Sequence, residues 1–434
     1  MHSRRGSKRR RTDEGAEQPD AGSLRPEKET SAPANDPDRL LESLERRGRR
    51  RLDRFALTIH FGRHRFPHPY RYLGDKDIHR CLDYAAACGV EDLHIDMVDH
   101  FLRTCSTLSF PSGFSRLVRL SLLRVGRVSF GYSLSSDAFP ALEVIHLRSA
   151  RSVDLNHLLS ASPRLRTLDL RYCQSLDTLG AINIMPARGH LRSLTVAECD
   201  RLTHLYAGTA SGLLSLRLSS ALLPTYDILS TAPLEDLYIC LRGPTCLTKL
   251  RNLPSLRELQ LLMFATTSTN LAHIYMFLRT CRCPQLERLF VQLPTCSHDT
   301  FMGNSSEERL YYEDMYDEDP LDGNVPQEEQ PEEDVPEYGL NNLMIAKMMK
   351  FKGHYFEMRL VIFLLRKAPG LKKLLLVAPK GHIKALGKHT LDISHLIDSK
   401  LPRSRRASPD SQIILSETDF AASQPVHSDV FARF

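Results

Sequence analysis

The sequence predicts an α/β fold in which one strand-and-helix unit repeats along the chain, and three observations support this prediction. A six-residue pattern L-x-x-L-x-L, with other aliphatic residues allowed, recurs ten times, mostly at intervals of 21 to 30 residues. Prolines stand just before many of these units. Stretches with apolar residues at helical spacing lie between several of them.

The repeated pattern is that of a leucine-rich repeat solenoid. Within each unit, x-L-x-L predicts a short strand whose leucines face the core while the intervening residues line the opposite, concave side. Because one unit cannot bury its own leucines, the units must stack into one continuous core. We therefore expect a horseshoe of about ten repeats, whose units begin at Val90, Leu117, Leu142, Leu165, Leu191, Leu213, Leu234, Leu256, Leu286 and Leu371.

Prolines separate the helices from the strands. They stand one or two residues before the first leucine of six units, at Pro140, Pro163, Pro233, Pro254, Pro284 and Pro369. Because proline cannot continue a helix, each one marks a switch from helix to strand. Helices on the convex side are expected within residues 77–89, 155–163, 271–281 and 355–369.

Composition and cysteine spacing indicate a reducing compartment. Ten cysteines are irregularly spaced in 434 residues, and the first residues are polar and basic. We expect reduced thiols, no membrane insertion and a location in the nucleus or cytoplasm. Cys173 and Cys199 stand eight residues after the first leucine of their units, so they are expected to close the turn that leaves the strand.

Several phrases outside the repeats carry a family resemblance. They are RFALTIHFGRH from Arg54, DIHRCLDYAAACGVEDLHIDM from Asp77, VIFLLRKAPGLKKLLLVAPK from Val361 and SPDSQIILSETD from Ser408. Over residues 52–420 the chain resembles plant, particularly grass-type, F-box and leucine-rich repeat proteins with an FBD-like C-terminal segment. The resemblance implies a protein-binding module that recognises substrates for a Skp–cullin–F-box ubiquitin ligase.

The resemblance lacks one part. The family has a three-helix F-box before its opening strand, and that box binds the Skp adaptor. Here only DPDRLLESLERRGRRRLDR, from Asp36 to Arg54, stands in that place, and the chain has no tryptophan for the family's arginine-tryptophan phrase. Skp adaptor and cullin thus remain open as partners, and the protein target is unidentified.

Charge is strongly segregated along the chain. Residues 306–338 hold 14 acidic residues and one arginine, whereas residues 347–406 hold 15 lysines or arginines and three acids. The acidic stretch predicts a disordered insertion, which would account for the 85-residue step before Leu371. The expected organisation is a disordered basic head at 1–38, a basic linker or F-box remnant at 39–54, repeats at 55–300, the acidic insertion at 301–341, the last repeat with the FBD-like segment at 342–399, and a tail at 400–434.

The concave side chains are the candidate partner-binding site. Four of them, Arg119, Arg148, Arg171 and Arg217, suggest a basic strip for an acidic partner. A face that is merely solvated is the alternative interpretation. The complete predicted set is Arg119, His146, Arg148, Asp169, Arg171, Arg217, Tyr238, Gln260, Phe290 and Gln292, with Tyr238 and Phe290 as aromatic anchors.

The remaining motifs do not indicate catalysis. No nucleotide-binding, zinc-protease or nucleophile-elbow motif is present, so we expect no enzyme activity and no cofactor. Cys281, Cys283 and distant His298 are too few and wrongly spaced for zinc. Lys8, Arg9, Arg10 and Arg11 form a candidate nuclear import signal. Nucleic-acid binding through the basic C-terminal stretch is the alternative function, and it would be strongly salt-dependent.

Overall fold

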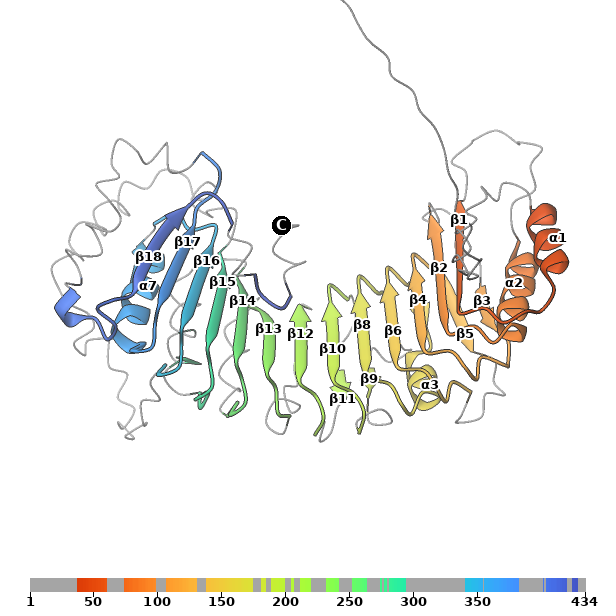
Figure 1. The fold of residues 1–434 in the computed structure, drawn as a ribbon, viewed down its shortest axis with the longest axis horizontal. Coiled ribbons are helices and arrows are strands. Elements are labelled where there is room, and N and C mark those ends of the chain that lie inside the picture. The colour runs from red at the N-terminus through yellow and green to blue at the C-terminus, as the bar shows by residue number, and fades with distance from the viewer. Residues whose placement is uncertain are drawn as a thin grey trace, which may run out of the picture.

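A single parallel sheet organises the molecule. The computed structural model describes residues 37–60, 74–98, 107–130, 138–174, 181–184, 189–199, 204–206, 211–219, 232–241, 252–263, 274, 277–278, 281–293, 340–353, 355–381, 401, 403–419 and 424–427. The sheet has 13 strands in the order β1-β2-β4-β6-β8-β10-β12-β13-β14-β15-β16-β17-β18. The strands lie side by side in one curved row, in the order of the sequence (Figure 1).

The ten predicted units each supply one strand of this sheet. Every strand begins two residues after the first leucine of its unit, where the alternation of the motif starts. The ten strands are β2 (Asp92–Val98), β4 (Arg119–Leu123), β6 (Val144–Arg148), β8 (Thr167–Arg171), β10 (Ser193–Ala197), β12 (Ser215–Ser219), β13 (Asp236–Leu241), β14 (Glu258–Met263), β15 (Arg288–Gln292) and β17 (Lys373–Val377).

Three further strands of the main sheet were not among the predicted units. The first, β1 (Arg54–His60), opens the sheet, and the last, β18 (Gln412–Ser416), lies within the predicted tail at 400–434. The third is β16 (Ile345–Met349), whose unit starts at Leu343 and carries Ala346 and Met348 where leucines are usual. The 85-residue step therefore contains a whole additional repeat, and the acidic insertion alone does not account for it.

Helices pack against one face of the sheet. Those found are α1 (Pro37–Arg47), α2 (Asp75–Ala87), α3 (Leu155–Ser160) and α7 (Tyr355–Lys367), together with the 3-10 turn η5 (Arg403–Arg405). Three of them match predicted helices, whereas α1 lies in the predicted linker. The fourth predicted helix, at 271–281, falls largely outside the described residues, as do the Lys8–Arg11 cluster and residues 301–339 of the acidic stretch.

Short strands continue several repeats beyond the main sheet. One small sheet contains β3 (Thr107–Phe110), β5 (Arg127–Phe130) and β7 (Ser152–Val153), and another contains β9 (Ala181–Asn183) and β11 (His204–Tyr206). Phe110 of β3 stacks on Phe130 of β5 with ring centroids 5.2 Å apart. These aromatic contacts fill the space between neighbouring repeats near the N-terminal end.

The leucines form one continuous core. Leu120, Leu168 and Leu194 are fully buried, in one cluster with Leu82 of α2 and Leu364 of α7. Each fully buried aliphatic side chain contributes about 1.5–3 kcal/mol to folding. The residues that alternate with these leucines point to the opposite side of the sheet, which we call the concave face.

One carbonyl group per repeat connects each unit to the next. The carbonyl of Glu143 accepts hydrogen bonds from the amides of Arg166 and Thr167, at 2.8 and 2.9 Å. The Glu287 carbonyl accepts them in the same way from Met344 and Ile345, at 2.9 and 3.1 Å, across the residues of the acidic stretch. The register of the sheet is thereby continuous from one repeat to the next.

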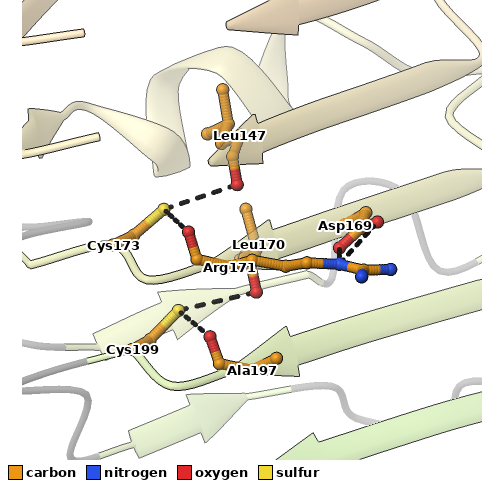
Figure 2. Close-up of polar contacts among 7 residues, drawn as sticks. All are labelled: Leu147, Asp169, Leu170, Arg171, Cys173, Ala197 and Cys199. Carbon is orange, nitrogen blue, oxygen red and sulfur yellow. Dashed lines mark hydrogen bonds and ion pairs between the residues drawn. The ribbon is translucent and has the colours of Figure 1, made fainter. Parts of the chain in front are cut away.

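A left-handed residue ends several strands. Arg124, Ser149, Tyr172, Glu198 and Lys350 all have φ between 50° and 61°, and each lies seven residues after the first leucine of its unit. In two of these repeats the residue that follows is a cysteine, which closes the turn. Figure 2 shows the thiol of Cys173 donating to the carbonyls of Leu147 and Arg171, at 3.6 and 3.5 Å. Cys199 makes the equivalent contacts one repeat later, with the carbonyls of Leu170 and Ala197.

Candidate protein-binding surface

The parallel register aligns the concave side chains in rows across the strands. His146 and Asp169 face each other on β6 and β8, and Arg217 faces Tyr238 on β12 and β13. Six of the predicted residues share this middle row, namely His146, Asp169, Arg217, Tyr238, Gln260 and Phe290. Arg119 lies in the row where the strands begin, and Arg148, Arg171 and Gln292 lie in the row where they end.

Arginines and aspartates alternate over the N-terminal half of the face. Arg119 Nη1 lies 3.6 Å from Asp92 Oδ2. The guanidinium of Arg124 pairs with Asp96 at the end of β2. Arg171 Nε lies 2.7 Å from Asp169 Oδ1 in the same strand, as Figure 2 shows. The predicted basic strip is therefore partly neutralised by its own neighbours.

Arg148 differs from the other arginines of this half. Among the residues that the structure describes, it forms no ion pair, and its guanidinium lies 6.0 Å from the ring centre of Tyr172. Tyr172 is 46% exposed. Arginine and tyrosine are both enriched among the residues that dominate binding at protein interfaces, and a guanidinium near an aromatic face is attracted to it. The sequence prediction missed Tyr172, although its place seven residues after Leu165 could have been found from the repeat.

His146 is half-buried between charged neighbours. Loss of solvent lowers the pKa of its imidazole below the ordinary value, because the charged form is poorly hydrated there. The carboxylates of Asp169 and Asp92 oppose this shift, and the guanidiniums of Arg119 and Arg171 add to it. At neutral pH this part of the face therefore carries a neutral imidazole.

The C-terminal half of the face is closed to solvent. Tyr238, Gln260, Phe290 and Gln292 are each no more than 1% exposed, and Arg217 is nearly buried with its guanidinium 5.2 Å from the Tyr238 ring centre. Tyr238 and Phe290, which the sequence predicts as aromatic anchors for a partner, are therefore covered in this structure. Residues 424–427, from the far end of the chain, contact Asp236, Tyr238 and Glu258 in this half, and the sequence pattern gave no sign of that contact.

The described residues give little support for other kinds of site. They contain no group of three or more histidines, cysteines or carboxylates placed to hold a metal ion. Cys283 instead donates its thiol to the Cys281 carbonyl at 3.6 Å. Among the same residues, no helix is both long enough and apolar enough to cross a bilayer.

A comparison with protein-family models identifies the family to which this chain belongs. Residues 70–410 match the family model described as At1g61320/AtMIF1, LRR domain. The chain belongs to this leucine-rich repeat family. Leucine-rich repeat domains of this family are typically not enzymes, and they suggest a module for protein–protein interaction.

Other comparisons add little to this leucine-rich repeat assignment. No curated protein matches the chain. A crystal structure of a Bacteroides fragilis protein aligns with 69% of this chain and 68% of its own, at 13% identity and a TM-score of 0.25. A similarity that low supports no conclusion about fold or function. Within the concave face of this leucine-rich repeat domain, the part that solvent reaches is the N-terminal half.

Proposed function

We propose that this leucine-rich repeat domain recognises an acidic segment of a protein partner through the N-terminal half of its concave face. The observation that supports this proposal best is the pair formed by Arg148 and Tyr172. The exposed ring offers apolar contact area, and the guanidinium above it offers a charge without a carboxylate partner among the described residues. A carboxylate of the partner would complete this pair.

The charge balance of the surrounding surface favours the same partner. Five arginines, Arg54, Arg119, Arg124, Arg148 and Arg171, project from or follow β1 to β8, against the three aspartates Asp92, Asp96 and Asp169. The surplus of two positive charges would attract an acidic segment and repel a basic one. A partner with aspartates or glutamates beside an apolar residue suits both features.

We further propose that the biological role is substrate recognition of the kind that the F-box resemblance implies. The segment expected as an F-box remnant has another structural use, which bears on this role. Leu41 of α1 is buried in the common core, Glu45 accepts a 2.7 Å bond from Arg80, and Tyr84 donates to the Gly48 carbonyl at 3.0 Å. Residues 37–54 thus cover the open end of the first repeat, as terminal caps of solenoids do. A coupling to a Skp adaptor would need other residues or another protein.

The experiment is affinity capture with the full chain. Wild type and the double variant Arg148→Glu/Arg171→Glu are tagged, expressed in the cells of origin and purified, and bound proteins are identified by mass spectrometry. The matched control is Arg127→Glu, an exposed arginine on β5 outside the main sheet. We expect one or more acidic proteins to be retained by wild type and control and lost from the double variant.

Each result of this capture has a definite meaning. Equal capture by the double variant would contradict the proposed surface. Skp adaptor and cullin among the retained proteins would support the ligase role, and their consistent absence would leave an interaction module without ubiquitin transfer. Captured material that nuclease treatment releases, with affinity falling steeply as salt rises, would instead favour the nucleic-acid alternative.

A further inference from the structure

A short segment near the C-terminus contacts the concave face far from its own strand. After β18 ends at Ser416, the described residues 424–427 lie beside β13 and β14, as the dark-blue segment near those strands in Figure 1 shows. The amide of Val426 donates to Glu258 Oε1 at 2.6 Å. The imidazole Nε2 of His427 lies 2.9 Å from Asp236 Oδ1. Two carboxylates on neighbouring strands thus hold the segment.

These two carboxylates also have partners within the sheet itself. Asp236 and Glu258 are direct neighbours in the register of β13 and β14. The Ser215 hydroxyl donates to Asp236 Oδ1 at 2.6 Å, and Arg288 Nη2 lies 2.7 Å from Glu258 Oε2. Partners within the sheet fix both carboxylates, so a ligand that binds them needs little rearrangement of the site.

The surface around the carboxylates is rich in hydrogen-bond acceptors. The side-chain amide of Gln260 donates to Glu258 Oε1 at 2.6 Å, whereas its own Oε1 is buried and accepts no hydrogen bond within the described part of the chain. Buried acceptors without donors are uncommon in folded proteins, because each one costs the hydration that it loses. Such atoms suit a ligand that brings N–H groups.

Within the described residues, Pro425 is buried and the His427 side chain is 11% exposed, so the middle of the segment packs on the sheet. Besides the two polar contacts, the His427 ring meets the Tyr238 ring edge-on at 6.1 Å, while the Val426 side chain is 53% exposed. Upstream, Gln424 donates to Asp419 at 2.9 Å, and Asp419 pairs with the buried Lys347 of β16. Asp419 is thus held on β16 by a contact that does not involve Asp236 or Glu258.

We propose that Asp236, Glu258, Tyr238 and Gln260 form a peptide-binding site, which the chain's own residues 424–427 occupy until a partner displaces them. The partner is a protein segment that presents a main-chain N–H to Glu258 and an imidazole or cationic side chain to Asp236. This partner segment is neutral or positively charged, whereas the segment proposed for the Arg148 surface is acidic. The two surfaces therefore select different sequences on one partner or on two.

A labelled peptide tests this proposal in the full-length chain. The probe is a fluorescent synthetic peptide with the sequence of residues 417–434, and its affinity is measured by anisotropy for wild type, for His427→Ala and for the matched control His157→Ala. His157 is a histidine of α3 that lies near Asp154, outside the concave face. Because His427→Ala weakens the intramolecular occupant, the peptide should bind that variant about tenfold more tightly than wild type or control.

A second probe avoids any question of folding. The same peptide carrying His427→Ala should bind the His427→Ala protein about tenfold more weakly than the unmodified peptide does. Equal affinity of the two peptides, or no peptide binding to the His427→Ala chain, would overturn the proposal, and the segment would then be a fixed part of the fold. The Arg148→Glu/Arg171→Glu chain should bind the peptide as wild type does, so this result is independent of the proposed function.

Discussion

Arg148 and Arg171 lie directly opposite each other on the neighbouring strands β6 and β8, and only Arg171 has a carboxylate beside it, that of Asp169. Like charges at facing positions destabilise a sheet by a few tenths of a kcal/mol. We therefore expect Arg148→Gln to raise the free energy of unfolding by about 0.2–0.5 kcal/mol while weakening partner capture. Urea denaturation and the capture experiment measure the two effects. If Arg148→Gln lowered the free energy of unfolding and left partner capture unchanged, both the repulsion and the binding role of Arg148 would be contradicted.

Leucine burial should dominate the stability of the repeats. Leu168 on β8 has no exposed surface and lies in the common core. Leu168→Ala should lower the free energy of unfolding by about 2–5 kcal/mol, because it leaves a cavity between two repeats. Arg164→Ala, in the exposed turn before the same strand, is the control and should change it by less than about 0.5 kcal/mol. Chemical denaturation followed by circular dichroism compares them.

The left-handed position that ends several of the strands should accept glycine and reject β-branched residues. Ser149 has φ of 56° at this position. The left-handed conformation costs a residue with a Cβ about 1–2 kcal/mol, whereas glycine costs about 0.4–1 kcal/mol in the entropy of the unfolded chain. Ser149→Gly should thus be slightly stabilising, and Ser149→Val should be destabilising by more than about 1 kcal/mol. The reverse order of melting temperatures would show that the turn is not maintained in solution.

Protonation of His146 should destabilise the fold in mild acid. Burial lowers the pKa of its imidazole below that of the unfolded chain, so the unfolded state binds more protons between the two values. The contribution of this residue is complete above the unfolded pKa and declines as the pH falls through the folded one. The free energy of unfolding of wild type should fall more steeply from pH 7 to pH 5 than that of His146→Asn. Parallel slopes would show that His146 titrates normally.

Cys81 should be unreactive in the native state. Cys81 of α2 is completely buried, and burial, with the nearby carboxylate of Asp77, raises the pKa of its thiol to about 11. At pH 8 only about one thiol in a thousand would be ionised. Iodoacetamide should therefore label Cys81 rapidly in urea and very slowly without it, as peptide mass spectrometry would detect. Rapid native labelling would indicate that α2 opens frequently.

The sequence predicted the strands well because the leucine pattern has a local physical cause. A buried x-L-x-L strand needs only its own alternation and a similar neighbour, so all ten predicted units correspond to strands. The strand β16 was missed because Ala346 and Met348 replace leucines while filling the same core positions. In β18 the corresponding Ile413 and Leu415 are only partly buried, at the end of the sheet.

The candidate surface was less predictable from the sequence. Alternation placed Arg148 and Tyr238 on the same face, but it gave no information about what covers that face. Tyr238 is buried beneath His427, which is 189 residues away in the chain, and Glu258 is bonded to Val426. Contacts over such separations depend on where the chain goes after the last strand, and no local pattern encodes that path.

The shared carbonyl at the start of each repeat also bears on how such a chain can change in evolution. The carbonyl of Glu287 accepts hydrogen bonds from Met344 and Ile345 just as the carbonyl of Glu143 does from Arg166 and Thr167. The stretch of chain between Glu287 and Met344 is more than twice as long as that between Glu143 and Arg166. The length of chain between two repeats is thus independent of the geometry with which they join. Connecting segments can be gained, lost or exchanged between related genes while the neighbouring strands keep their alignment, so new sequence can be acquired without refashioning the sheet.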